Sequence, residues 1–152
     1  MIYPDFLELL HAFENHKVQY ALIGGYAVGI YAEPRFTKDL DILISPTKAN
    51  AKAVLAALTE YGAPVDNLTI SDLSKPGLLY VFGISPLRVD ILNGIKGADV
   101  KGIMKRVTSI DLSGISVRVA NVKDLIALKK LAGRPQDKAD IAKLKEWTKS
   151  RR

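Results

Sequence analysis

The chain has 152 residues, of which 48% are hydrophobic and 25% charged, and this balance predicts one globular domain with its own core. Cysteine is absent, which excludes a disulfide framework and favours a reducing cytoplasm. The stretch 1–11 lacks the basic and apolar regions of a signal peptide, and no apolar run approaches the roughly 18 residues of a membrane span, so we expect a soluble cytoplasmic protein. The net charge of +6 favours a phosphate-bearing partner.

The first 62 residues alternate between helical and β-like patterns. Apolar residues at i, i+3, i+4 and i+7 predict a helix over residues 4–15. The apolar run 18–23 predicts a strand that enters a turn at Gly24 and Gly25, and a short helix over 26–32 ends before Pro34. A second strand over 40–44 follows, and then an alanine-rich helix over 47–61 that ends at Gly62.

The remainder begins with β-like runs and ends with two helices. The runs 68–73, 78–82 and 88–92 are separated by turn residues and predict a meander. A short helix over 99–106 and a last strand over 116–120 come next, followed by helices over 121–132 and 135–149. We therefore expect an α+β fold with a mixed sheet flanked by helices, in which the helical pair 121–149 packs on a single domain 1–152.

Two acidic residues mark the predicted strand of residues 40–44. Asp41 lies on the strand and Asp39 directly precedes it. Residues two apart on a strand place their side chains on one face, with Cα atoms about 6.5 to 7 Å apart, while Leu40 and Ile42 point to the other face. Like charges this close favour a bound cation, and carboxylate oxygens suit Mg²⁺ or Mn²⁺. The alternative is an exposed strand with acidic outward positions.

The turn at Gly24 and Gly25 joins a predicted strand directly to a helix. Such a turn presents free backbone N–H groups at the positive end of a helix, where a phosphate can approach without meeting a Cβ. By itself the pair of glycines indicates only a turn. Together with the two aspartates, it predicts that phosphate oxygens and a divalent cation meet at one place.

This combination resembles the signature of the DNA polymerase β-like nucleotidyltransferase superfamily, hG[GS] followed about nine to thirteen residues later by Dh[DE]h. Here the residues read IGG, thirteen intervening positions, and DLDI. The resemblance implies the superfamily's fold, an NTP substrate with its phosphates over Gly24 and Gly25, and divalent ions held by three acids. Two of these acids would be Asp39 and Asp41.

The third acid of that superfamily comes from a later, neighbouring strand, and Asp90 fits this position. It lies in the β-like run Arg88-Val89-Asp90-Ile91-Leu92 and is flanked by apolar residues. The resemblance therefore implies that Asp90 is both a metal ligand and a catalytic residue. The alternative is an edge-strand acid paired with Arg88, which points to the same face.

Lys129 lies near the middle of the apolar face of the predicted helix 121–132. A lysine there either extends its amine to water along the helix surface or enters a cleft. The segment 124–140 resembles the C-terminal motif of AbiEii-type toxin-like nucleotidyltransferases, which implies a phosphate contact for Lys129 and supporting roles for Arg134, Asp137 and Asp140. The same resemblance places Arg35 and Thr37, which precede Asp39, at the rim of the nucleotide cleft.

These features predict a minimal nucleotidyltransferase that transfers a nucleoside monophosphate to a hydroxyl group, as in toxin–antitoxin systems. The acceptor is open among a tRNA end, a protein and a small molecule, and the basic tail of Lys149, Arg151 and Arg152 favours RNA. One alternative is a catalytically silent member of the fold that acts as an antitoxin or protein-interaction module. A simple RNA-binding domain is disfavoured, because no strand interleaves aromatic and basic residues.

Overall fold

The structure is a computed structural model that describes residues 2–151, so Arg152 of the basic tail and Met1 lie outside the described residues. Helices and strands alternate along most of the chain. In chain order they are α1 (Pro4–Asn15), β1 (Tyr20–Ile23), α2 (Gly24–Tyr31), β2 (Asp39–Ile44), α3 (Lys48–Tyr61), α4 (Ile70–Ser74), β3 (Leu79–Phe82), β4 (Arg88–Leu92), α5 (Val100–Lys105), β5 (Thr108–Leu112), β6 (Ile115–Val119), α6 (Val122–Ala132) and α7 (Pro135–Ser150).

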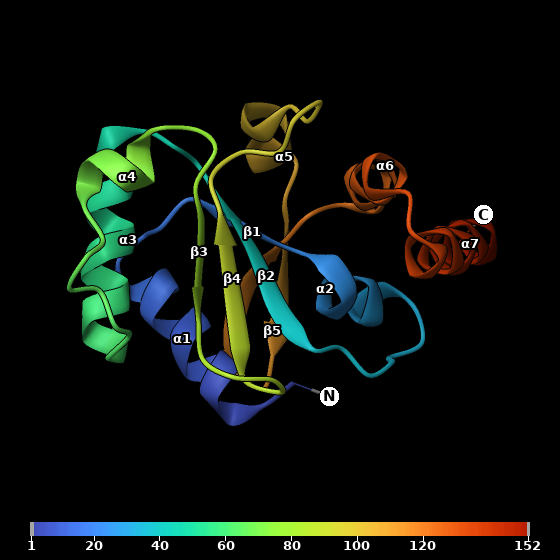
Figure 1. The fold of residues 1–152 in the computed structure, drawn as a ribbon. Helices are drawn as coiled ribbons and strands as arrows, with labels where there is room; N and C mark the ends of the chain where they lie inside the picture. Colours follow the sequence, from blue (N-terminus) through green and yellow to red (C-terminus); the bar gives the residue numbers. More distant parts are fainter. Residues whose placement is uncertain (1, 152) are drawn as a thin grey trace.

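Within residues 2–151 the strands form one six-stranded sheet in the order β3-β4-β2-β1-β6-β5. β2 runs parallel to β4 and β1 parallel to β6, whereas the pairs β1–β2, β3–β4 and β5–β6 are antiparallel. Figure 1 shows α1, α3 and α4 to the left of the sheet and α2, α6 and α7 to its right. The predicted α+β fold with a mixed sheet flanked by helices is confirmed.

The core lies mainly between the sheet and the helices α1 and α3. The apolar stripe predicted for residues 4–15 is fully buried at Leu9, Leu10 and Phe13. Each such side chain stabilises the fold by roughly 1.5 to 3 kcal/mol through the apolar surface that it removes from water. Helix α3 begins at the Thr47 cap and ends at Gly62, whose φ of +94° suits glycine. In the described part of the chain, no helix combines the length and apolarity that crossing a membrane requires.

The predicted strand over residues 68–73 is wrong, because this segment forms the short helix α4. Thr69 and Asp72 make a capping box, in which the Asp72 N–H donates to Thr69 Oγ1 at 3.0 Å and the Thr69 N–H to Asp72 Oδ2 at 3.1 Å. At the other end, the buried Asn93 side chain donates to the Leu73 and Lys75 carbonyls at 3.0 and 2.7 Å. These bonds satisfy both ends of a helix that is too short to be stable alone.

Two further differences concern the strands. The predicted three-strand meander reduces to the hairpin β3–β4, since β4 pairs on its other side with β2. The structure adds β5, which pairs with β6 through all five of its residues. Only Ile110 and Leu112 of β5 are apolar, so the alternation of apolar and polar residues that predicts a strand is short here.

Candidate active site

Three aspartate side chains from two neighbouring strands meet on one face of the sheet. β2 supplies Asp39 and Asp41, β4 supplies Asp90, and the parallel register sets Asp41 directly opposite Asp90. Because side chains alternate along a strand, both aspartates of β2 share this face while Leu40 and Ile42 point into the core. One carboxylate oxygen from each aspartate lies within 4.8 Å of the other two. We call these three residues the acidic cluster.

The acidic cluster carries more negative charge than its surroundings neutralise. Burial, and then the charges of Asp39 and Asp90, raise the pKa of Asp41 to about 7. Burial and the charge of Asp90 likewise raise the pKa of Asp39. Lys129 and Arg134 favour the ionised form of Asp41, but their effect is outweighed. An additional cation at this place would therefore be stabilised.

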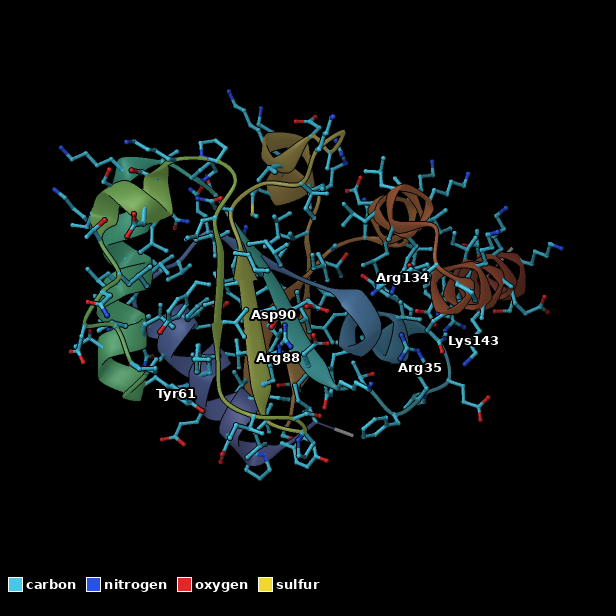
Figure 2. The ribbon with its side chains drawn as sticks, in the orientation of Figure 1. Arg35, Tyr61, Arg88, Asp90, Arg134 and Lys143 are labelled. Atoms are coloured by element: carbon cyan, nitrogen blue, oxygen red, sulfur yellow. The ribbon has the colours of Figure 1, made fainter. Side chains whose placement is uncertain are left out.

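Arg88 forms hydrogen bonds with one member of the acidic cluster. Its Nε donates to Asp90 Oδ1 at 2.8 Å and its Nη2 donates to Asp90 Oδ2 at 3.2 Å. In the strand register Arg88 stands directly opposite Asp39. Figure 2 shows Arg88 and Asp90 together on β4. The sequence analysis gave an Arg88–Asp90 ion pair as the alternative to a metal site. The structure has this ion pair, and it also brings three carboxylates close enough to hold a metal ion.

The start of α2 lies against the acidic cluster. Gly24 has a φ of +73°, and an added Cβ there would collide with the Asp41 carboxylate. At Gly25, an added Cβ would lie 2.8 Å from the Thr37 side chain. Ile23 provides no side-chain hydrogen bond to cap this helix, so its first N–H groups have no side-chain acceptor from the capping position. The glycines therefore leave a positive helix end beside the carboxylates.

A cavity of about 350 Å³ opens beside the acidic cluster. Its charged lining includes Asp41 together with Lys96, Lys129 and Arg134. The apolar lining is formed by Leu92, Ile95, Leu125, Leu128 and Leu131, among others. The cavity therefore has a charged part next to the acidic cluster and an apolar part beyond it. A second cavity, of about 400 Å³, lies between α2 and the β5–β6 turn, and it contains none of the three acids.

Lys129 lies in a second group of charged residues, between α6 and α7. Its Nζ is 3.0 Å from Asp137 Oδ1 and 3.0 Å from Asp140 Oδ2. Arg35 donates two hydrogen bonds to Asp140, at 3.0 and 2.8 Å, and Arg134 Nε donates to Asp137 at 2.8 Å. We call these five residues the ion-pair cluster. Lys129 is only 7% exposed, so the alternative of an amine extended to water is wrong.

The carboxylates of the ion-pair cluster are neutralised by their partners. Burial raises the pKa of Asp137, but hydrogen bonds from Arg134 and Lys129 outweigh burial and lower it to about 2. Burial is outweighed at Asp140 too, where hydrogen bonds from Arg35 and Lys129 lower the pKa. Both aspartates are fully buried, and both are stable as anions. The ammonium of Lys129 holds them while it also lines the cavity beside Asp41.

The loop before β2 places Arg35 and Thr37 against the start of α2. An added Cβ at Gly25 would lie 2.9 Å from Arg35 Nη2. Thr37 is buried, and its hydroxyl donates to the Arg35 carbonyl at 3.3 Å. The structure thus sets the predicted rim loop next to the glycine turn. It also gives Arg35 a carboxylate partner on α7, which its position in the sequence does not indicate.

Arg134 and Lys96 complete the positive side of the cavity. Arg134 lies between Gly133, where α6 ends with a φ of +66°, and Pro135, where α7 begins, so the turn itself positions it. Figure 2 shows Arg134 beside α6 and α7. Lys96 follows β4 in a loop, and the sequence carries no signal for it, since its place depends on where that loop turns.

The acidic cluster fits a divalent metal ion by the chemistry of its donors. It offers three carboxylates from rigid strands, which are the hard oxygen ligands that Mg²⁺ and Mn²⁺ prefer. Burial first, and then mutual repulsion, raises the pKa values of Asp39 and Asp41, and a bound cation would offset that repulsion. Asp39, Asp41 and Asp90 are therefore the residues that could hold such an ion.

Comparisons with known proteins agree with the fold. A family model described as a nucleotidyl transferase of unknown function (DUF2204) matches residues 3–152. Among solved structures, the chain resembles an antigenic nucleotidyltransferase-like protein from Paracoccidioides brasiliensis, with a TM-score of 0.55 at 16% identity. That match covers 94% of this chain and 77% of the other. No curated protein gave a match.

Proposed function

Because the chain belongs to the DUF2204 family of nucleotidyl transferases, we propose that it is a metal-dependent enzyme that transfers a nucleoside monophosphate from an NTP to a hydroxyl group. The observation that carries the proposal is the acidic cluster beside the open start of α2. Asp41 and Asp90 face each other in register, and their oxygens lie within 4.8 Å of one from Asp39. Carboxylates that could hold a cation thus adjoin a helix end that attracts phosphate.

We assign metal binding to Asp39, Asp41 and Asp90, with Mg²⁺ or Mn²⁺ as the ion. When bound, such an ion would polarise the α-phosphoryl group and lower the pKa of the attacking hydroxyl. Transfer forms a bond between the acceptor oxygen and the α-phosphorus, breaks the bond from that phosphorus to the oxygen bridging to the β-phosphate, and releases pyrophosphate. The proton of the hydroxyl passes to Asp90, which is part of β4 and therefore held rigidly.

We assign the triphosphate to the start of α2 at Gly24 and Gly25, where the first N–H groups have no side-chain cap. Arg134 is 72% exposed along its side chain and lines the adjoining cavity, so it is the cation best able to contact phosphate directly. Lys129 acts over a longer range, because both its carboxylate partners hold it in the α6–α7 interface. Arg35 and Thr37 keep the rim loop in place against the glycines.

The acceptor belongs to one of three classes: a tRNA end, a protein hydroxyl or a small molecule. A role in a toxin–antitoxin system, suggested by the resemblance to AbiEii-type proteins, and action in the cytoplasm, suggested by the absence of cysteine, complete the proposal. The test is incubation with each of four radiolabelled NTPs, Mg²⁺ and a cell extract. We expect label in RNA, protein or small molecules with the wild type and none with Asp41→Ala. Transfer that survives this substitution would refute the proposed site.

The Arg88–Asp90 ion pair favours one alternative, a catalytically silent module in which arginine permanently takes the place of a metal. Asp90 would then serve stability or partner binding alone. Calorimetric titration with Mg²⁺ and each NTP separates the two functions. A silent module shows no metal-dependent nucleotide affinity, whereas an enzyme binds at least one NTP more tightly when Mg²⁺ is present.

A further inference from the structure

Arg88 is the charged residue in most direct contact with the acidic cluster, and the proposed reaction does not use it. Its guanidinium occupies both oxygens of Asp90 through the two hydrogen bonds described above. The Asp90 side chain is 11% exposed, whereas that of Arg88 is 43% exposed. The carboxylate is therefore fixed within the protein, and the guanidinium can leave it for solvent.

A divalent cation and Arg88 would share the charge of Asp90. The forked guanidinium donates one hydrogen bond to each oxygen of this carboxylate, and a cation held by the three carboxylates would bind one of the same oxygens. The two positive groups would then lie close together and repel each other, so each weakens the hold of the other on Asp90. Arg88 and a divalent ion also both lower the repulsion among the three carboxylates. The presence of one therefore reduces the free energy gained by binding the other.

We propose that Arg88 is a built-in counter-ion of the active site, which occupies Asp90 when metal is absent and competes with the divalent cation for it. The inference rests on the proposed metal site. In the metal-free protein Arg88 keeps the three carboxylates assembled despite their repulsion. It also weakens the binding of a metal ion without nucleotide. A metal–NTP complex makes additional contacts with the site, so metal and NTP bind together more readily than metal alone.

The chain provides a matched control in a second arginine–aspartate pair. Arg106 donates to Asp124 through Nε and Nη2 at 3.0 and 2.9 Å, and the two side chains are 48% and 12% exposed. This pair resembles Arg88–Asp90 in geometry and exposure, but it takes no part in the acidic cluster. Replacing either arginine by glutamine removes one charge and one forked contact, and only Arg88→Gln changes the proposed metal site.

The test measures Mn²⁺ binding without nucleotide, by electron paramagnetic resonance, on the wild type, Arg88→Gln, Arg88→Lys and Arg106→Gln. We expect Arg88→Gln to bind Mn²⁺ about three- to tenfold more tightly, since it removes a partly exposed but forked competitor. Arg88→Lys should fall between it and the wild type because lysine keeps the charge without the fork. Arg106→Gln should bind within about twofold of the wild type, because surface charge alone has a weak effect on a distant ion.

A second measurement distinguishes this role from a purely structural one. In EDTA, Arg88→Gln should unfold at a lower temperature than Arg106→Gln, and saturating Mn²⁺ should remove that difference. Unchanged or weaker Mn²⁺ binding by Arg88→Gln, with a normal wild-type signal, would overturn the role of Arg88 alone. Absence of Mn²⁺ binding from every variant would overturn both this role and the proposed function.

Discussion

The acidic cluster and the ion-pair cluster are built from the same residue type and have opposite electrostatics. In the acidic cluster Arg88 is hydrogen-bonded to Asp90 only, and the pKa values of Asp39 and Asp41 are raised. In the ion-pair cluster two aspartates meet three cations, and both pKa values are lowered. Burial acts in the same direction at both places. The difference comes from the number of cations within hydrogen-bonding distance.

This comparison separates carboxylates that can bind a metal from carboxylates that stabilise the fold. Asp137 and Asp140 already have strong partners, so removing either takes a buried carboxylate from two cations. Asp39 and Asp41 are short of positive charge, so neutralising one of them relieves repulsion. Replacing aspartate by asparagine should therefore reduce activity without reducing stability in the acidic cluster, and should reduce stability in the ion-pair cluster.

The largest expected effect is on catalysis in the acidic cluster. Asp41→Asn should reduce nucleotide transfer by at least about 10³-fold, because a ligand of the ion that stabilises the transition state is lost. The measurement is label transfer from NTP under conditions where wild type is active. The metal-free variant should be at least as stable as wild type in urea, and a large loss of stability would contradict the comparison.

The next effect is on stability in the ion-pair cluster. Asp140→Asn should lower the free energy of unfolding by about 3 kcal/mol, because Arg35 and Lys129 lose a fully buried partner. Urea denaturation at pH 7 measures this. Asp124→Asn provides the control. Its partner Arg106 is half exposed, so this substitution should lower the free energy of unfolding by less than about 1 kcal/mol. Equal losses in the two variants would remove the distinction between the clusters.

The two clusters should also give opposite pH dependence in the metal-free protein. The pKa of Asp41 is raised above its unfolded value, so stability is lost as pH rises from about 4 to about 7, by about 2 kcal/mol once partial exposure is allowed for. The pKa of Asp137 is lowered to about 2, so its contribution is lost as pH falls from about 4 through 2. Denaturation across pH 2–8 measures both. Asp41→Asn should reduce the loss of stability between about pH 4 and 7, and it should leave the loss below about pH 4 unchanged.

The smallest effect is stabilisation by metal. At pH 8, Mg²⁺ at about ten times its dissociation constant should raise the melting temperature by about 4 °C. The increase should disappear in Asp41→Asn and in Asp90→Asn, and it should persist in Asp124→Asn. Calorimetric scans with and without EDTA provide the measurement. An equal increase in all four proteins would place the bound ion elsewhere.

The sequence predicted the acidic cluster better than it predicted the surroundings of that cluster. The alternation of β2 is local, so the shared face of Asp39 and Asp41 follows from spacing alone. That Asp90 stands opposite Asp41 depends on β4 pairing with β2, and the choice of Asp90 came from the resemblance and the apolar run around it. The Asp140 partner of Arg35 could not be predicted, because it depends on how two segments 105 positions apart dock.

The errors in the fold have a similar origin. Residues 68–73 are apolar enough for a strand, and the Thr69–Asp72 capping box is a helix signal of four residues that competes with that pattern. Asn93 then fixes the helix from 18 to 21 residues away in the sequence. β5 has weak alternation and is stabilised mainly by pairing with β6. Short elements of this kind are determined by their partners more than by their own residues.

The bond between Arg35 and Asp140 spans 105 positions of the chain. Asp140 lies on α7, which follows every other described helix and strand, so a ribosome makes the rim loop long before it makes the residue that holds that loop in place. During synthesis the first strands can pair while the loop before β2 is still unanchored. The rim of the proposed nucleotide site therefore gains its anchor on α7 only after residue 140 has been made, later than the strands that carry the acidic cluster.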